Sequence, residues 1–421
     1  MNEALYEASE EEMWRQAAWA TTIPSVESVV ITPDAHAGAG VPIGLVVATK
    51  DYVAPCAAGY DISCGMLSMR TSLIAENIKD KIIRRSWMQE VESRVACGLG
   101  GHRVDGQIRI NGNLFEEILQ NGILALDAPQ NIRGRFERTH HIVKRYVRFK
   151  KAADRGMPEL ASLGSGNHFL ELQQDQKGTV WIMIHTGSRG YGHQVATEFF
   201  NRGFEWWNQS HPNEILGKGQ KELVSFPVDS EIGQDYLNAM NQAANYAIVN
   251  RYLIAKAVIE ATEKVFKSTP EILYEISHNL VQYEGGLWVH RKGATRALPA
   301  GHELLKGSIF ETTGHPVLIP GSMGTSSAIL TPKDSEKSLH SVNHGCGRVM
   351  SRGRAKRTFA QDVLNKEMDD MDILYNSRNV PIDESLHCYK DIDEVLSTVE
   401  GAELAITDIR LYPRAVIKGE S

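Results

Sequence analysis

The chain has 421 residues, of which 42% are hydrophobic and 23% are charged. This balance is typical of a globular protein and excludes a chain that is disordered as a whole. With 45 Lys and Arg against 52 Asp and Glu, the formal net charge is -7. Bulk positive charge therefore cannot attract nucleic acid to this chain, and any site for a polyanion must be local.

The first segment and the cysteines indicate a cytoplasmic protein. The first 16 residues, MNEALYEASEEEMWRQ, are acidic and lack the basic and apolar regions of a signal peptide. No run of 18 apolar residues follows. Five cysteines in so long a chain form an odd and sparse set, which is typical of a reducing compartment. We therefore expect neither export nor a membrane span.

Apolar runs along the chain predict buried strands, and most of them end at a polar or glycine-rich motif. The runs cover residues 29–31, 44–48, 180–184, 272–276 and 316–319. Apolar residues at helical spacing predict a long helix over residues 235–266, and Pro270 follows it closely. We assign this helix to the core and give it no chemistry. Because no linker or repeat divides the chain, we expect one domain of mixed helix and strand over residues 1–421.

One carboxylate, one thiol and three imidazoles suggest a metal site. Asp61 and Cys64 stand three residues apart in a glycine-bounded turn, GYDISCG, while His168, His185 and His278 occur as GNHF, HTGS and SHN. The structural alternative is a core cysteine beside a surface aspartate, with three hydrogen-bonded histidines. Five ligands exceed the four of a closed zinc site, so we expect two ions that share ligands. Thiolate favours zinc and carboxylate tolerates manganese, which leaves the metal open.

Two glycine-rich turns lie further along the chain. Residues 320–327, PGSMGTSS, follow a predicted strand and offer amides and hydroxyls suited to phosphate, although such turns are most often only turns. His344 begins the sequence HGCGR, where an accessible neutral imidazole is a competent nucleophile toward phosphorus. The alternative is a glycine turn with an exposed histidine. The chain has no GxxxxGK[ST], no strand-borne GxGxxG and no GxSxG, so neither a P-loop ATPase nor a Rossmann dehydrogenase is supported.

Taken together, these segments resemble the RtcB-type RNA-splicing ligases. The matching segments cover residues 34–38, 59–65, 166–171, 185–190, 277–279, 289–297, 320–323 and 344–348. The resemblance implies an α+β fold in which sheets flanked by helices surround a metal-containing cleft. It also implies an enzyme that joins RNA 2′,3′-cyclic phosphate or 3′-phosphate ends to 5′-hydroxyl ends, with GTP and manganese. Such enzymes act in RNA repair or tRNA splicing, some of them with an archease-like activator.

The resemblance implies a role for each matching residue. Two manganese ions would be held, with Cys64 as a bridge, by Asp61, Cys64, His168, His185 and His278, and His344 would become guanylylated. The implied GTP pocket consists of Asn167, His168, Phe169, Leu170, Glu171, His278, Asn279, Pro320, Gly321, Ser322, Met323, Ser327, His344, Gly345, Cys346, Gly347 and Lys418. The last residue lies in a C-terminal IKG motif and would recognise the guanine. Two departures, Cys346 in place of a small residue and the sequence APCAA before Gly59, leave open a divergent paralogue with a narrower RNA substrate.

Basic residues predict where RNA enters. Residues 133–155 hold nine Lys or Arg against Glu137 and Asp154, with aromatic residues between them. This composition suits a single-stranded backbone, although such a run is most often only a solvated helix face. We expect RNA to contact this segment, through Arg145, Arg148 and Lys151, and basic side chains nearer the metals, namely Arg189, Arg291, Lys292, Arg352 and Arg354.

Two other functions fit parts of this pattern. A dinuclear metal-dependent phosphoesterase or cyclic phosphodiesterase acting on RNA ends would use the same ligands and a phosphate loop. It would need neither His344 nor Lys418. An inactive RNA-binding paralogue is disfavoured because every expected ligand and the nucleophile are present. A covalent GMP adduct would distinguish the ligase from both.

Overall fold

The computed structural model describes residues 2–104, 108–136, 140–141, 147–211 and 220–419. The α-helices are α1 (Glu3–Glu7), α2 (Glu11–Ala20), α3 (Lys81–Glu92), α4 (Gly112–Asn121), α5 (Gln130–Arg133), α6 (Lys150–Glu159), α7 (Arg189–Ser210), α8 (Glu231–Phe266), α9 (Arg352–Thr358), α10 (Gln361–Asp370) and α11 (Ile392–Gly401). The predicted long helix is α8. It begins earlier than predicted because the Ser230 hydroxyl accepts a hydrogen bond from the Gly233 amide and caps the helix. It ends where Lys267 adopts a left-handed conformation.

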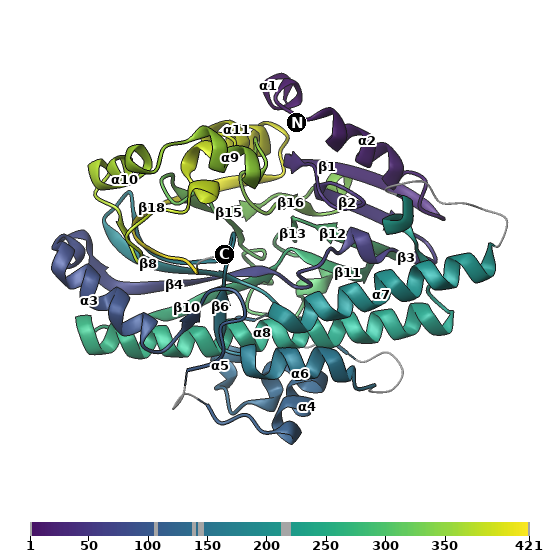
Figure 1. Cartoon of the computed structure of the whole chain (residues 1–421), viewed down its shortest axis with the longest axis horizontal. Helices are drawn as coiled ribbons and strands as arrows, with labels where there is room; N and C mark the ends of the chain where they lie inside the picture. Colours follow the sequence, from purple (N-terminus) through teal and green to yellow (C-terminus); the bar gives the residue numbers. More distant parts are fainter. Residues whose placement is uncertain (1, 105–107, 137–139, 142–146, 212–219, 420–421) are drawn as a thin grey trace.

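The strands form two larger sheets and several short pairs (Figure 1). The first sheet has the order β10 (Glu271–Ser277), β4 (Gly65–Ile74), β8 (Thr179–Thr186), β7 (Phe169–Asp175), β18 (Ala405–Ile417), β15 (Ser327–Pro332) and β14 (Val317–Ile319), with β17 (Leu374–Tyr375) beside β18. The second has the order β1 (Val26–His36), β2 (Ile43–Thr49), β12 (Leu287–Lys292) and β11 (Asn279–Glu284). The short pairs are β13 (Ala294–Arg296) with β16 (Ser341–Asn343), β3 (Tyr52–Val53) with β9 (Phe226–Pro227), and β5 (Ala96–Cys97) with β6 (Ser162–Gly164). The predicted strands correspond to β1, β2, β8, β10 and β14.

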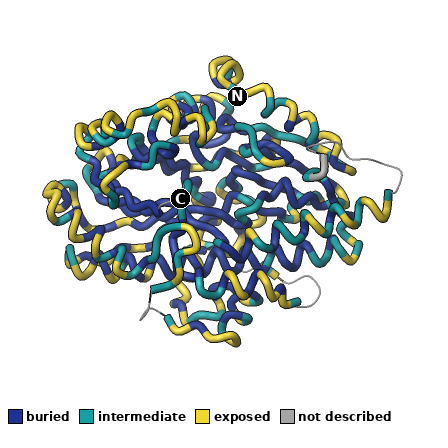
Figure 2. The backbone as a smooth tube through the Cα atoms, in the orientation of Figure 1, coloured by how far each residue is buried: buried dark blue, intermediate teal, exposed yellow. Residues whose placement is uncertain are grey.

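Helices cover the sheets, as predicted. In Figure 1, α8 runs beneath β4 and β10 with α7 alongside it, and it contacts β4 and β8. Figure 2 shows that the backbone is buried through the middle of the molecule and exposed on the outer helices. Strand β8 is buried at every residue after its first, which explains why its sequence is continuously apolar rather than alternating. The predicted α+β fold with sheets flanked by helices is confirmed. Within the described ranges, no helix combines the length and apolar character needed to cross a membrane.

The register of neighbouring strands brings distant motifs to one edge of the first sheet. The paired residues are Gly65 with Ser277, Gly65 with Thr186, His185 with Phe169, and Leu170 with Ile417. Cys64, His168 and His278 each stand next to one of these residues in the sequence, and Lys418 follows the last. The strand order therefore places the candidate ligands and the end of β18 at the same edge.

Candidate metal and nucleotide site

Two overlapping groups of metal-ligand side chains lie at this sheet edge. Cys64, His185 and His278 form one group, and Asp61, Cys64 and His168 form the other, with the ligand atoms of each group within 4.8 Å of one another. The closest approaches are Cys64 Sγ to His168 Nε2 at 3.4 Å, Cys64 Sγ to His185 Nε2 at 3.2 Å, His185 Nε2 to His278 Nε2 at 3.4 Å, and Asp61 Oδ2 to His168 Nε2 at 2.8 Å. The structure thus brings together all five side chains that the resemblance implies as metal ligands.

The donor set fits divalent cations. His168 Nδ1 lies 3.0 Å from a main-chain carbonyl oxygen, and a proton donated there leaves Nε2 as a lone-pair atom facing Asp61 and Cys64. Burial lowers the pKa of His185 and of His278 well below the usual value, and neutral imidazole is the form that binds metals. Burial, with the nearby Asp61 charge, raises the pKa of the Cys64 thiol. A thiolate at this position therefore needs a cation beside it.

The predicted nucleophile is held by a buried carboxylate. His344 Nδ1 lies 2.7 Å from Oδ2 of Asp34, which is fully buried, and the Thr32 hydroxyl donates to Oδ1 of the same carboxylate at 2.5 Å. Burial works to raise the pKa of Asp34, but the hydrogen bond and charge of His344 outweigh it and lower this pKa. A proton on Nδ1 is thus donated to a carboxylate, and this leaves Nε2 with its lone pair. The His344 ring packs edge-on against His278 with centroids 4.7 Å apart, which links it to the metal-ligand groups.

Asp34 received no role from the sequence, although it opens the matching segment 34–38. The resemblance of this segment to the family marked Asp34 as a residue of interest. The neighbouring sequence does not show which side chain its carboxylate will face. The pairing depends on β1 lying beside the turn that carries His344. Gly347 in that turn has φ +78°, and an added Cβ would collide with the Asp34 carbonyl oxygen. Only glycine lets the turn pack so closely on β1.

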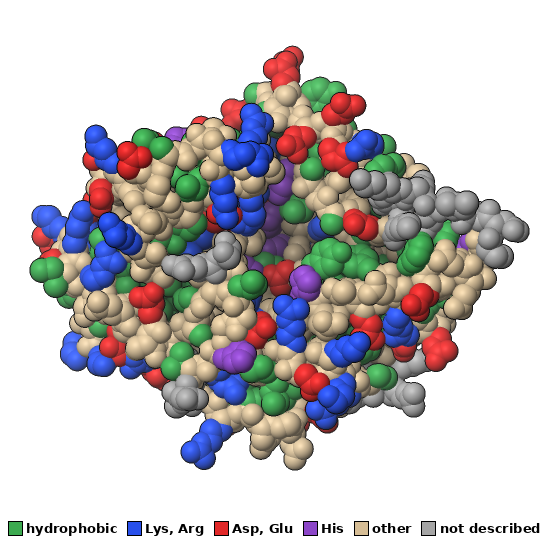
Figure 3. Space-filling model, viewed as in Figure 1, with side chains coloured by type: hydrophobic (Ala, Val, Ile, Leu, Met, Phe, Trp, Pro, Cys, Tyr) green, Lys and Arg blue, Asp and Glu red, His purple; other side chains and the backbone are tan. Residues whose placement is uncertain are grey.

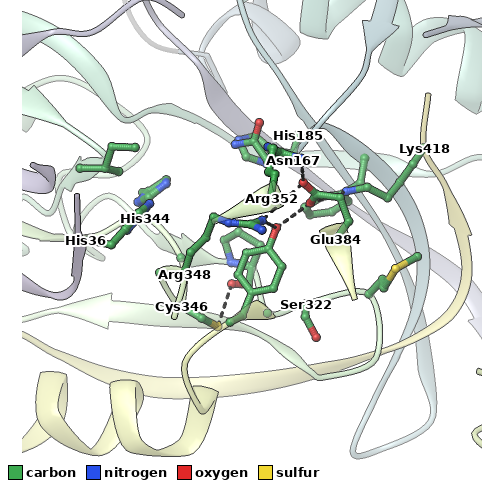
Figure 4. A pocket seen from close by; sticks show the side chains of 18 of the residues that line it. His36, Asn167, His185, Ser322, His344, Cys346, Arg348, Arg352, Glu384 and Lys418 are labelled. Carbon is green, nitrogen blue, oxygen red and sulfur yellow. Dashed lines mark hydrogen bonds and ion pairs between the residues drawn. The ribbon is translucent and has the colours of Figure 1, made fainter. Parts of the chain in front are cut away.

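A cavity of 390 Å³ extends from His344 to Lys418 (Figure 4). The predicted GTP-pocket residues that line it are Asn167, Phe169, Glu171, Pro320, Gly321, Ser322, Met323, His344, Gly345, Cys346, Gly347 and Lys418. Figure 4 shows His344 and His36 at one side of the cavity and Lys418 with Glu384 at the other. The cavity therefore connects the candidate nucleophile to a charged far end.

Other predicted pocket residues lie behind this lining. They are Leu170, Ser327, Asn279 and the two metal-ligand candidates His168 and His278. Side chains alternate between the two faces along a strand, so Leu170 points away from the cavity that Phe169 and Glu171 line. Leu170 is fully buried on the other face of β7. Ser327 Oγ accepts from the Gly321 amide at 3.3 Å, and the Asn279 side-chain amide donates to the Asp61 carbonyl at 2.9 Å. These residues support the cavity wall and the metal-ligand turn.

The far end of the cavity carries opposite charges beside an aromatic ring. Lys418 Nζ lies 3.3 Å from Glu384 Oε2 and 5.9 Å from the centre of the Phe169 ring. Burial acts to raise the pKa of Glu384, but the charges of Lys418 and Arg352 outweigh it and hold this pKa at about 2. Burial raises the pKa of Glu171 to about 7. A cation, a carboxylate and a titrating carboxyl group thus surround a space next to a ring.

Several lining residues were not predicted from the sequence, among them His36, Arg348, Ser351, Glu384 and Tyr389. His36 lies within a matching segment, so its position carried a signal. Glu384 and Tyr389 lie outside every matching segment, and their hydrogen bond to each other forms only in the folded chain. No local pattern in the sequence could have indicated them.

Two predicted RNA-binding side chains lie inside the fold, which corrects their assignment to an RNA path. Arg291 is 2% exposed and pairs with Glu284 at 2.7 Å, and Lys292 is 6% exposed and donates to two main-chain carbonyls at 2.6 and 2.9 Å. Both belong to β12, an inner strand with neighbours on both sides. Arg189 also packs inward, against Gly164, where a Cβ would collide with its guanidinium.

The other predicted RNA-binding residues lie on two separate surfaces. Arg352 lines the cavity and Arg354 is exposed, both on α9. Figure 3 shows a cluster of Lys and Arg over α9, beside a hollow in which histidines are visible. Arg148 and Lys151 are exposed near α6, which lies below α8 in Figure 1. Arg145 lies outside the described residues.

Comparisons with known proteins agree with the geometry. The family model described as tRNA-splicing ligase RtcB matches residues 16–419. Proteins named tRNA-splicing ligase RtcB are similar over most of their length. That of Pyrobaculum aerophilum is 35% identical over 93% of this chain and 87% of its own, that of Thermococcus kodakarensis 36% over 96% and 90%, and that of Methanococcus maripaludis 32% over 100% and 94%. By the length and level of these matches, this chain belongs to the tRNA-splicing ligase RtcB family.

Proposed function

We propose that this RNA ligase joins RNA 2′,3′-cyclic phosphate or 3′-phosphate ends to 5′-hydroxyl ends through a GMP–histidine intermediate, with GTP, in tRNA splicing or RNA repair. One contact supports this chemistry most directly. His344 Nδ1 is bound to the buried Asp34 carboxylate, so Nε2 is the reactive nitrogen at the wall of a nucleotide-sized cavity. A cytoplasmic location and an archease-like activator are further proposals of the same kind.

The residues of the cavity fit a reaction in which GMP is transferred first to His344 and then to the RNA end. His344 Nε2 attacks the α-phosphorus of GTP, the bond to pyrophosphate breaks, and pyrophosphate leaves with the electron pair. Asp34 stabilises the positive charge on the ring. A 2′,3′-cyclic phosphate end is first opened by water, which leaves a 3′-phosphate and a 2′-hydroxyl. An oxygen of the RNA 3′-phosphate then bonds to the phosphorus of the histidine-bound GMP, and the bond from that phosphorus to Nε2 breaks with its electron pair returning to the ring. The 5′-hydroxyl attacks this activated phosphate, loses its proton and releases GMP, which closes the phosphodiester bond.

Metal ions belong to this proposal because the five converging ligands fit them. Two manganese ions held by Asp61, Cys64, His168, His185 and His278 would neutralise the negative charge on the phosphate oxygens. The shared position of Cys64 in both ligand groups supports a bridge between two sites. His344 lies next to His278, so metal ions held by these ligands would lie close to the nucleophile.

The far end of the cavity favours guanine over adenine. The hydrogen-bonding edge of guanine carries two donors and one acceptor. Glu384 and Glu171 offer carboxylate acceptors, and Lys418 offers a donor, which matches this pattern. The Phe169 ring gives an apolar face against which a base could stack.

RNA reaches the site across α9 in this proposal. Arg352 lies at the cavity, and Arg354, Lys356 and Arg357 extend the positive surface along the same helix. Figure 3 shows this surface beside the hollow that holds the histidines. Residues 133–155 remain the alternative route. Four of their described basic side chains pair with acids, among them Arg148 with Glu116 at 3.0 Å.

The experiment that tests the function is covalent labelling. The full chain is incubated with GTP labelled at the α-phosphate and with Mn²⁺, and the denatured protein is examined for bound label. We expect an acid-labile adduct in the unmodified protein and none in His344→Ala, which should still bind GTP. His387→Ala is the matched control, because this histidine is exposed and pairs with Glu367.

Two outcomes would contradict the proposal. A label that persists in His344→Ala would place the nucleophile elsewhere. Hydrolysis of RNA cyclic phosphates without any adduct or joining would identify a metal-dependent phosphoesterase instead, which has no use for the pairing of Asp34 with His344.

A further inference from the structure

Helix α8 places two polar residues, Asn250 and Arg251, beneath the candidate metal site. Both side chains are fully buried. An arginine is almost never fully buried unless its guanidinium is paired and hydrogen-bonded. From the sequence we placed this helix in the core and gave it no functional role. That placement does not explain why a charged side chain is buried at position 251.

The Arg251 guanidinium contacts three segments, each adjacent to a candidate ligand. It donates to the Ser63 carbonyl at 2.7 Å, to the Thr186 carbonyl at 2.9 Å and to the Ser277 hydroxyl at 3.0 Å. Nε donates to Glu275 at 2.6 Å, and this buried carboxylate balances the charge. The three contacted residues directly precede or follow Cys64, His185 and His278 in the sequence. These three ligands form one of the two metal-ligand groups.

The ligand turn is shaped around this guanidinium. Ser63 has φ +55°, a left-handed conformation that is unfavourable for a residue other than glycine. The hydrogen bond from Arg251 to the Ser63 carbonyl holds this conformation, which turns the chain between Asp61 and Cys64. Gly65 leaves room for the same group, because a Cβ there would lie 3.1 Å from Arg251 Cζ.

Asn250 extends the support to the neighbouring strand end. Its Oδ1 accepts from the Ala161 amide at 2.7 Å, and its side-chain amide donates to the Gly187 carbonyl at 3.2 Å. Two residues after Ala161, the carbonyl of Leu163 accepts the hydrogen bond from His168 Nδ1. One turn of α8 thus contacts the backbone beside most of the candidate ligands.

We propose that Arg251 is a positioning residue that sets the separation of Cys64, His185 and His278 for metal binding. The inference rests on the metal site of the proposed function. Arg251 touches neither metal nor nucleotide, and acts through the turns that carry the ligands. Side chains that orient ligands in this way contribute about 10- to 100-fold to metal affinity.

The competing explanation is that Arg251 only stabilises the fold through its pair with Glu275. Removing one partner of a buried pair leaves an unpaired buried charge, which strongly destabilises a protein, whereas replacing both partners by apolar residues is often neutral. The test therefore uses Arg251→Met with Glu275→Met in the full chain. A second variant, Arg251→Lys, keeps the charge opposite Glu275 but cannot reach all three turns from one nitrogen.

The measurements are Mn²⁺ affinity by calorimetry on the metal-free protein, and thermal unfolding without metal. We expect both variants to fold and to bind Mn²⁺ about 10- to 100-fold more weakly. The matched control is Arg84→Met, because Arg84 is also fully buried and contacts one carboxylate, of Asp372, and three main-chain carbonyls. This control should unfold at a lower temperature yet bind Mn²⁺ with the affinity of the unmodified protein.

A folded variant of Arg251 with unchanged Mn²⁺ affinity would overturn the inference, even if RNA joining were demonstrated. Conversely, an unmodified chain that binds Mn²⁺ but joins no RNA would contradict the proposed function. The Mn²⁺ titrations of the Arg251 variants would still decide the role of Arg251. Failure of the unmodified chain to bind Mn²⁺ would overturn the metal site and this inference together.

Discussion

Asp34 is fully buried, and both of its carboxylate oxygens take part in hydrogen bonds with side chains. Because this carboxylate is shielded from solvent, the contact with His344 fixes both the tautomer and the orientation of the imidazole. The same contact compensates the charge that forms on the ring when Nε2 bonds to phosphorus.

The variant Asp34→Asn should retain the fold and GTP binding but slow the formation of the GMP adduct. A hydrogen bond to a charged group contributes about 1.5–3 kcal/mol, which corresponds to a rate loss of about ten- to a hundredfold. Single-turnover labelling measures this rate, and calorimetry with GTP is the control. An adduct formed at the unmodified rate would show that Asp34 only supports the turn.

At the scale of elements, α9 is a short helix with a basic surface at the cavity rim. The double variant Arg354→Ala, Arg357→Ala should leave self-guanylylation unchanged and weaken RNA joining. Each lost phosphate contact should also reduce the salt slope of RNA binding by about 1. The matched comparison is Arg148→Ala with Lys151→Ala near α6. If that pair flattens the slope instead, RNA enters along residues 133–155.

The hairpin of β11 and β12 is held by a buried ion pair that predicts acid sensitivity. Burial acts to raise the pKa of Glu284, but Arg291 and Arg296 outweigh it and hold this pKa at about 2, below its ordinary value of 4.5. The unfolded chain therefore binds the proton first. The stabilisation is fully present above pH 4.5 and is lost as the pH falls toward 2.

A depression of this size corresponds to about 3 kcal/mol at neutral pH. In urea unfolding at pH 6, Glu284→Gln should therefore be less stable than the unmodified protein. The difference in unfolding free energy should shrink as the pH is lowered to about 3. A difference that stays constant with pH would show that packing, rather than the charge of Glu284, stabilises the hairpin.

At the scale of the whole molecule, the metal-ligand groups join strand ends from the first half of the chain to the turn between β10 and β11. A metal that binds only the folded state should therefore stabilise the entire chain. At a free concentration of a hundred times the dissociation constant, this linkage contributes about 2.7 kcal/mol.

Mn²⁺ should accordingly raise the unfolding temperature of the unmodified protein, and a chelator should reverse the rise. Cys64→Ala should abolish the rise, because a methyl group cannot replace a thiolate. Cys97→Ala, a change in the partly buried strand β5, should preserve it. A full rise in Cys64→Ala would exclude this thiol as a ligand.

The sequence was enough to predict the longest helix, five of the strands and the five metal-ligand candidates. A continuous apolar run predicted β8, because a strand buried on both faces carries apolar residues at every position. Apolar residues at helical spacing predicted α8, because a helix that packs on the core repeats them with the period of its turns. The five metal-ligand candidates were predicted because each stands in a short motif. Their convergence on Cys64 followed once the strands that bear them became neighbours.

Which side chains face one another, and which face solvent, became clear from the folded chain alone. Arg291 and Lys292 looked available for RNA but belong to an inner strand, and exposure depends on strand order rather than on the motif. The contacts of Asp34 with His344 and of Arg251 with the ligand turns join residues far apart in the chain. Such contacts follow from register and packing, which no local spacing of residues encodes.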